Sequence, residues 1–107
     1  MTDNQFDTVI NQIAGNVQGF IAASLVDLDS GMPLATRSSR PEFDLDVASA
    51  YNSELVKAKL NTMRVLNITS DLEDMLLTLG DQLHLIKLVG GRAFIYVAAD
   101  RWGARVP

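Results

Sequence analysis

The 107-residue chain is long enough for one hydrophobic core and contains no linker-like stretch, so we expect a single domain spanning residues 1–107. Hydrophobic residues make up 48% and charged residues 21%, which excludes an intrinsically disordered chain. The absence of cysteine excludes disulfides and cysteine-based nucleophiles or metal sites. The net charge of −4 without a basic patch argues against nucleic-acid binding. Neither a membrane-spanning apolar run nor a positively charged signal peptide is visible, so a cytoplasmic protein is expected.

The N-terminal residues predict a short amphipathic helix. Thr2 or Asp3 can cap it, and Gly15 and Gly19 bracket its end. Its apolar residues recur at helical spacing, so they form one face: Phe6, Val9, Ile10 and Ile13. A helix this short needs a sheet to lie on.

A β-hairpin is predicted to follow the helix. Residues 20–26 favour a strand, residues 27–31 a hairpin loop in which Gly31 supplies a positive φ, and residues 32–36 an antiparallel return. Because Pro33 has no amide hydrogen to donate to a ladder, the returning strand is expected at an edge of the sheet.

A long helix is predicted to begin at Asp44 or Asp46, where an acid lies near the positive end of the helix dipole. Its apolar stripe is broader than contact with one sheet requires. The stripe comprises Ala48, Tyr51, Leu55, Val56, Leu60, Met63 and Leu66. Either the helix contacts two surfaces, or it lies deep in its own fold.

The last third predicts three strands joined by tight turns, over residues 72–79, 82–88 and 93–99. Gly80-Asp81 and Gly90-Gly91 are the expected turns. Several of these strands are apolar on both faces, which is typical of a sheet covered on both sides, so we expect a helix on each face. Residues 101–107 are too short and too interrupted by Gly and Pro to form another stable helix.

Three stretches resemble the roadblock (dynein light chain) family. Residues 24–35 are similar to its first hairpin, residues 77–86 to a later hairpin and residues 94–101 to its last strand, and the similarity spans about residues 6–101. The resemblance implies an α/β (α+β), roadblock/profilin-like fold. Its five-stranded antiparallel sheet carries helices on its faces, in the order helix-strand-strand-helix-strand-strand-strand. Many relatives have a third helix after the last strand, which is absent or vestigial here.

The resemblance also implies partners. Such domains form homodimers or heterodimers by joining sheets through the third strand and packing the long helices together, and many bind or regulate Ras-like small GTPases. The corresponding dimer residues in this sequence would be Tyr51, Leu55, Lys59, Leu72, Asp74 and Leu76. Contacts with a further partner could come from Arg92 and Arg101, as arginine fingers, and from Trp102. Trp102 could instead cover the sheet in place of the third helix.

Several residues that could carry chemistry have simpler structural explanations. Counted from Asp27, an EF-hand loop would need Gly at position six and Glu at position twelve, but Gly31 is fifth and Ser38 is twelfth, so a plain turn is expected. His84 is the only histidine, and the sequence names no partner for proton transfer. A strand follows Gly90-Gly91, whereas a phosphate loop opens a helix.

The acidic cluster of Asp71, Glu73 and Asp74 is not expected to form a catalytic carboxylate pair. Adjacent strand residues point to opposite faces, so Glu73 and Asp74 would not share a site. The acids would instead discourage indiscriminate strand pairing at an edge, or pair with Lys57 and Lys59.

The function expected from the sequence is that of a non-enzymatic dimeric interaction module. It would pair with itself or with another roadblock chain and would scaffold or regulate a Ras-like small GTPase in signalling. No catalytic residue, metal or cofactor is expected, and neither nucleic acid nor membrane is an expected partner. The alternative is a small-molecule-sensing regulatory domain, which needs an apolar cavity with convergent polar groups, and the sequence shows no such cluster.

Overall fold

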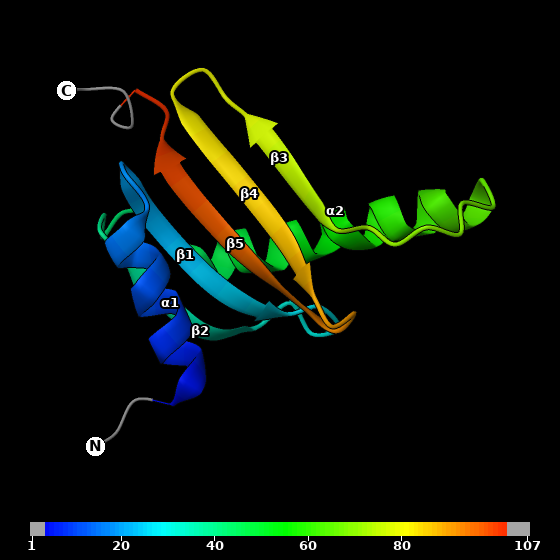
Figure 1. Ribbon diagram of the computed structural model, residues 1–107, viewed down its shortest axis with the longest axis horizontal. Coiled ribbons are helices and arrows are strands. Elements are labelled where there is room, and N and C mark those ends of the chain that lie inside the picture. The colour runs from blue at the N-terminus through cyan, green and yellow to red at the C-terminus, as the bar shows by residue number, and fades with distance from the viewer. Residues whose placement is uncertain (1–3, 103–107) are drawn as a thin grey trace.

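A computed structural model describes residues 4–102 of the chain, which form one five-stranded sheet and two helices (Figure 1). The elements in chain order are α1 (Gln5–Asn16), β1 (Phe20–Asp27), β2 (Pro33–Ser38), α2 (Leu45–Val65), β3 (Asp74–Thr78), β4 (Gln82–Val89) and β5 (Ala93–Asp100). The strands lie in the order β2-β1-β5-β4-β3, and every neighbouring pair is antiparallel. The element order and the antiparallel sheet expected from the sequence are confirmed.

The two helices lie on opposite faces of the sheet, as the two-sided apolar strands indicated. Figure 1 shows α1 in front of β1 and β2, and α2 crossing behind the sheet. Two separate clusters of buried side chains result. Ile10 of α1 packs with Ala23, Leu25, Ala35 and Val97 on the α1 side of the sheet.

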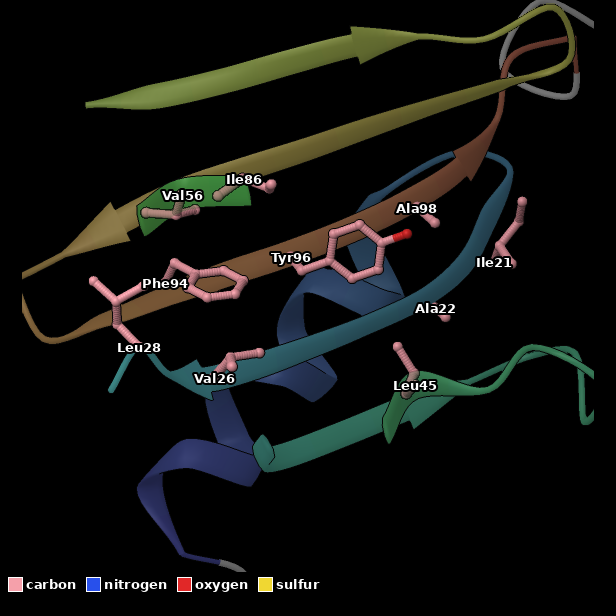
Figure 2. Close-up of a cluster of buried hydrophobic side chains, with 10 residues drawn as sticks. All are labelled: Ile21, Ala22, Val26, Leu28, Leu45, Val56, Ile86, Phe94, Tyr96 and Ala98. Atoms are coloured by element: carbon pink, nitrogen blue, oxygen red, sulfur yellow. The ribbon is translucent and has the colours of Figure 1, made fainter. Parts of the chain in front are cut away.

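The larger cluster lies between the sheet and α2 (Figure 2). Phe94 and Tyr96 of β5 are its largest buried side chains, and Val56 of α2 lies near Ile86 of β4 in this view. Its ten members are Ile21, Ala22, Val26, Leu28, Leu45, Val56, Ile86, Phe94, Tyr96 and Ala98. Burial of these apolar surfaces is the main force that holds α2 on the sheet.

Helix α1 begins one residue later than a cap at Asp3 would place it. The cap is Asn4, whose Oδ1 accepts a 2.9 Å hydrogen bond from the amide of Asp7. The predicted caps Thr2 and Asp3 lie outside the described residues. Of the predicted apolar face, Ile10 is buried and Ile13 is half-buried, whereas Phe6 and Val9 are 38% and 40% exposed.

The β1–β2 connection is a tight turn built on Asp27. Its Oδ2 accepts hydrogen bonds from the amide and the hydroxyl of Ser30, at 2.9 and 2.6 Å. Both bonds lower the pKa of the Asp27 carboxyl, and the bond from the Ser30 hydroxyl contributes more to this shift than the bond from the Ser30 amide. Gly31 follows with φ +74°, so the predicted turn with a positive-φ glycine is confirmed.

Helix α2 begins at the predicted cap Asp44, whose Oδ1 accepts from the amide of Val47 at 3.1 Å. Two buried serines on its inner side bond to the first hairpin. The hydroxyls of Ser49 and Ser24 lie 3.1 Å apart, and Ser53 Oγ donates to the carbonyl oxygen of Leu28 at 2.7 Å. These polar contacts fix the rotation of α2, which apolar packing alone would leave less defined.

Strand β3 is shorter than predicted, because Leu72 and Glu73 precede it and Leu79 follows it. The carbonyl oxygen of Glu73 still accepts from the Leu88 amide at 2.9 Å, but the Leu72 side chain packs beside the α2-side cluster. At the other end, the Leu79 amide donates to the Gln82 carbonyl oxygen and closes the turn. Arg101 and Trp102 form a turn after β5, and residues 103–107, where the sequence predicted no helix, lie outside the described residues.

Candidate protein interaction surface

Strand β3 forms one edge of the sheet, where the sequence-based comparison placed the dimer seam. Among residues 4–102 it pairs with β4 alone, so the backbone groups on its outer side have no neighbouring strand in this part of the chain. Such a row of unpaired amides and carbonyls is a template for another strand. Leu76, at the middle of β3, is 63% exposed.

The other edge, β2, is less suited to pairing. It begins at Pro33, which cannot donate to a ladder, and the hydroxyl of Ser39 just beyond its end bonds back to carbonyl oxygens of β1 at 2.9 Å. α1 also packs against this strand. Within the described part of the chain, β3 is therefore the more accessible template for a partner strand.

The broad apolar stripe of α2 divides between two sides of the helix. Val56, Ser49 and Ser53 are buried toward the sheet, and Met63, near the end of the helix, is buried beside the segment that leads to β3. Tyr51 and Leu55 are exposed, at 75% and 38%, and Lys59 follows them at the same spacing of four residues. Residues spaced by four lie on one side of a helix, so Tyr51, Leu55 and Lys59 form an outer stripe.

The six residues predicted for the dimer surface do not share one face. By register, Asp74 and Leu76 lie on the same side of β3, and Leu76 lines a hollow with Ile13 and Val17 of α1. This side is opposite to α2 and its outer stripe. Leu72 is half-buried against the α2-side cluster, so its side chain contributes mainly to the core. A partner that used all six positions would have to contact both the sheet edge and α2.

The lysines considered as partners of the acidic edge differ in position. Lys57 Nζ donates to the carbonyl oxygen of Asp29 at 3.0 Å and lies 3.8 Å from a carboxylate oxygen of Glu54. Lys57 therefore does not pair with the acidic residues 71–74, although the sequence analysis considered that pairing. Lys59 borders a shallow hollow that the acidic segment 71–74 also lines.

The residues proposed for a further partner lie at opposite ends of the sheet. Arg92 is exposed in the β4–β5 turn, and its carbonyl oxygen accepts from the Leu28 amide. Arg101 Nη1 donates to the Leu79 carbonyl oxygen at 3.1 Å, and its guanidinium lies 5.2 Å from the centre of the Trp102 ring. Trp102 Nε1 in turn donates to the Gly80 carbonyl oxygen. Arg101 and Trp102 thus bind the end of β5 to the β3–β4 turn.

Sequence reasoning did not find a partner for His84, but the sheet supplies one from the neighbouring strand. His84 Nδ1 lies 3.2 Å from the Tyr96 hydroxyl, and Nε2 lies 2.8 Å from Gln82 Oε1. Burial lowers the pKa of His84 and raises the pKa of Tyr96 to about 12. The sequence alone did not show this contact, because it depends on the register between β4 and β5. His84 pairs with Ala98, and Tyr96 lies two residues from Ala98 on the same face of β5. The arrangement is a partly buried polar contact between β4 and β5 on the α2 side of the sheet, where Ser24 of β1 is the cross-strand neighbour of Tyr96.

Among residues 4–102, no three His, Cys, Asp or Glu side chains gather in a way that could hold a metal ion. In the same part of the chain, neither helix is both long and apolar enough to cross a membrane.

The fold matches solved roadblock structures over nearly the whole chain. A Roadblock/LC7 domain from Streptomyces avermitilis aligns with a TM-score of 0.79 and 18% identity, covering 92% of this chain and 80% of that one. Myxococcus xanthus MglB aligns with a TM-score of 0.83 and 13% identity, covering 96% and 81%. MglC from Myxococcus xanthus gives a TM-score of 0.56 and 22% identity, covering 90% and 80%. No family model matches the sequence, and no curated protein matches it.

These structural similarities identify the fold of the chain. The chain has the roadblock fold, a five-stranded antiparallel sheet between helices, as the sequence resemblance implied.

Proposed function

We propose that this chain is a non-catalytic dimeric interaction module that regulates or scaffolds a Ras-like small GTPase. The observation that carries the proposal is the combination of an unpaired β3 edge with an exposed stripe on α2 in one roadblock-fold protomer. The β3 edge offers backbone hydrogen bonds to the sheet of another protomer, and the α2 stripe offers Tyr51 and Leu55 for packing. The proposed regulation of a GTPase is based on the resemblance to the roadblock family.

Self-association has support from a relative of the same fold. An MglB structure is described as having a tetrameric arrangement, and it aligns with this chain at a TM-score of 0.75 and 14% identity. In the proposed dimer, two β3 strands pair and extend the sheet across both protomers. Each 100 Å² of apolar surface that becomes buried would contribute roughly 2.5 kcal/mol before the costs of association are subtracted.

The dimer is tested by sedimentation equilibrium over a wide concentration range, where a species near twice 11.7 kDa is expected. Leu55→Asp places a charge in the proposed helix contact and should shift the population to monomer. Met32→Asp is the matched control, because Met32 is 65% exposed and lies just before β2, the other edge strand. A Leu55→Asp variant that sediments as an unchanged dimer would remove α2 from the interface.

The GTPase partner is tested by titrating purified Ras-like GTPases, loaded with GDP or a GTP analogue, against the wild type and Leu55→Asp. We expect saturable binding that prefers one nucleotide state and weakens when the dimer is disrupted. If the protein is dimeric but binds no GTPase, the GTPase role is refuted. The proposal is then reduced to a dimeric scaffold.

The alternative of small-molecule sensing has less support. The apolar hollow between α1 and strands β3, β4 and β5 has Lys87 as its only charged lining residue and lacks the convergent polar groups that orient a small ligand.

A further inference from the structure

The turn between β3 and β4 differs in backbone conformation from the other two hairpin turns of the sheet. Gly31 in the β1–β2 turn and Gly90 and Gly91 in the β4–β5 turn have positive φ, at +74°, +64° and +80°. No residue from 79 to 82, where β3 passes into β4, has a positive φ. Tight turns with positive φ match the right-handed twist of paired strands, whereas turns without it splay the two strands. The β3–β4 turn therefore does less than the other two to keep its strands together.

Support for this turn comes from two residues that follow β5 at the same end of the sheet (Figure 1). The carbonyl oxygens of three consecutive turn residues each accept a hydrogen bond from Arg101 or Trp102. Arg101 donates twice, from Nη1 to the Leu79 oxygen at 3.1 Å and from its amide to the Asp81 oxygen at 2.9 Å. Trp102 Nε1 donates to the Gly80 oxygen at 3.1 Å. We call these three bonds the 101–102 link.

The two donor residues are themselves held in place. The amide of Asp100 donates to the Gly19 carbonyl oxygen at 2.7 Å, and Asp100 Oδ1 accepts from the Trp102 amide at 2.9 Å. Asp100 Oδ2 lies 3.7 Å from a guanidinium nitrogen of Arg40, in the loop before α2. The Arg101 guanidinium lies 5.2 Å from the centre of the Trp102 ring, so the two donor side chains also attract each other. The link therefore connects the β3–β4 turn to two further loops of the fold.

Strand β3 depends on this turn for its position. It is five residues long, and among residues 4–102 it pairs with β4 alone. At its first end the Leu88 amide donates to the Glu73 carbonyl oxygen at 2.9 Å, and at its last end the Leu79 amide donates to the Gln82 carbonyl oxygen at 2.8 Å. The 101–102 link acts at the last end, beside the bond between Leu79 and Gln82.

We propose that Arg101 and Trp102 are positioning residues for the β3 edge, because they hold the β3–β4 turn and so keep the outer side of β3 in line for a partner strand. A ladder forms only where the amides and carbonyls of two strands are in register and in line. The proposal rests on the proposed function, in which a second sheet pairs with β3. It gives the two residues an internal role, whereas the sequence led us to expect direct contacts with a partner.

Amide hydrogen exchange, followed by NMR, tests whether the link holds the turn. Trp102→Phe keeps an aromatic ring beside Arg101 and removes the indole donor, and Arg101→Met keeps an apolar stem and removes the guanidinium. Each variant should speed exchange of the Leu79 amide by about threefold to tenfold, the range that one such hydrogen bond contributes. The Leu88 amide, at the other end of β3, should keep its rate. Unchanged exchange at Leu79 in both variants, or equal acceleration at Leu88, would overturn the proposal.

The matched control is Arg92→Met, the same change at an exposed position in the turn at the opposite end of the sheet. It should leave the exchange rate of the Leu79 amide unchanged. If it speeds that exchange as much as Arg101→Met does, the effect is not specific to the link, and the proposal fails.

Sedimentation equilibrium then tests whether the turn positions the edge. The dissociation constant of the dimer should rise by about threefold or more in Trp102→Phe and Arg101→Met, and it should stay unchanged in Arg92→Met. Faster exchange at Leu79 with an unchanged dissociation constant would overturn the positioning role. A wild type that stays monomeric at every concentration refutes the dimer of the proposed function, and the Leu79 exchange rates alone then decide the role of the link.

A rescue variant separates positioning from a general loss of stability. Gly80→Asn combined with Asp81→Gly introduces an Asn-Gly pair, which favours positive φ at both positions of a two-residue turn. Such a turn holds its strands without outside support. In this background, Trp102→Phe should no longer speed exchange at Leu79 or weaken the dimer. An effect of Trp102→Phe that is equally large in both backgrounds would overturn the proposal.

Discussion

The hydroxyl of Ser53 in α2 donates a 2.7 Å hydrogen bond to the carbonyl oxygen of Leu28, in the turn that follows β1, and both residues are buried. The contact joins the middle of α2 to the first hairpin. Ser53→Ala removes the donor and leaves the carbonyl oxygen buried, so we expect a loss of about 1 kcal/mol in the free energy of unfolding. Urea denaturation followed by circular dichroism measures it, and an unchanged midpoint would contradict this role for Ser53.

The Ser24–Ser49 pair should behave differently when both members are changed. Each hydroxyl is fully buried, and they lie 3.1 Å apart between β1 and α2. Either single change to Ala leaves one hydroxyl without its partner and should cost about 1–2 kcal/mol. The double variant removes both polar groups, so it should be less destabilised than the sum of the single variants. Strict additivity in this double-mutant cycle would show that the two hydroxyls do not interact.

Gly31 is expected to resist substitution because of its backbone conformation. Its φ of +74° lies in the left-handed region, and an added Cβ would meet Ala50 Cα at 3.4 Å and Ser53 Cβ at 3.5 Å. Those distances are ordinary contacts, so the backbone strain dominates, and Gly31→Ala should cost about 1 kcal/mol. Gly15→Ala is the matched control, since nothing lies near its Cβ position in α1, and it should stabilise the helix by up to about 1 kcal/mol. Opposite shifts in thermal midpoint are expected, and equal shifts would refute the argument.

His84 should make stability depend on pH in the mildly acidic range. Burial lowers its pKa in the folded state below the ordinary value of 6.5, so the unfolded chain binds a proton first. Its contribution to stability is therefore complete above pH 6.5 and is lost as the pH falls through the lower, folded-state pKa. His84→Gln should flatten the fall in the free energy of unfolding between pH 7 and about 5, above the range where most carboxylates titrate. Equal slopes in the variant and the wild type would contradict the prediction.

The architecture was largely predictable because its signals are local. The α2 cap at Asp44, the positive-φ turn at Gly31 and the two-sided apolar strands follow from neighbouring residues, and they led to the correct element order and sheet type. The end of β3 nearest α2 was less predictable, because Leu72 continues the strand pattern in sequence while its side chain packs beside the core. Tertiary packing decided that boundary.

The surface was harder to predict for the same reason. The apolar stripe of α2 gave no means to tell Val56, which faces the sheet, from Tyr51, which faces solvent. Leu76 was grouped with α2, although strand register places it on the other side of the sheet beside Leu85. Which face a strand residue occupies depends on pairing with a distant segment, and periodicity alone leaves the two faces equivalent.

The position of β5 has a consequence for how the chain folds. β1 and β2 form one hairpin, β3 and β4 form another, and β5 is the strand that joins these two halves of the sheet. It follows the other six elements in the chain, and its pairing with β1 links segments about seventy residues apart. β5 can pair with β4 locally through the turn at Gly90-Gly91, but the inner edge of β1 stays unpaired until β5 reaches it. The step that completes the native sheet is a long-range closure, and chains that have not reached it expose two edges suited to misassembly.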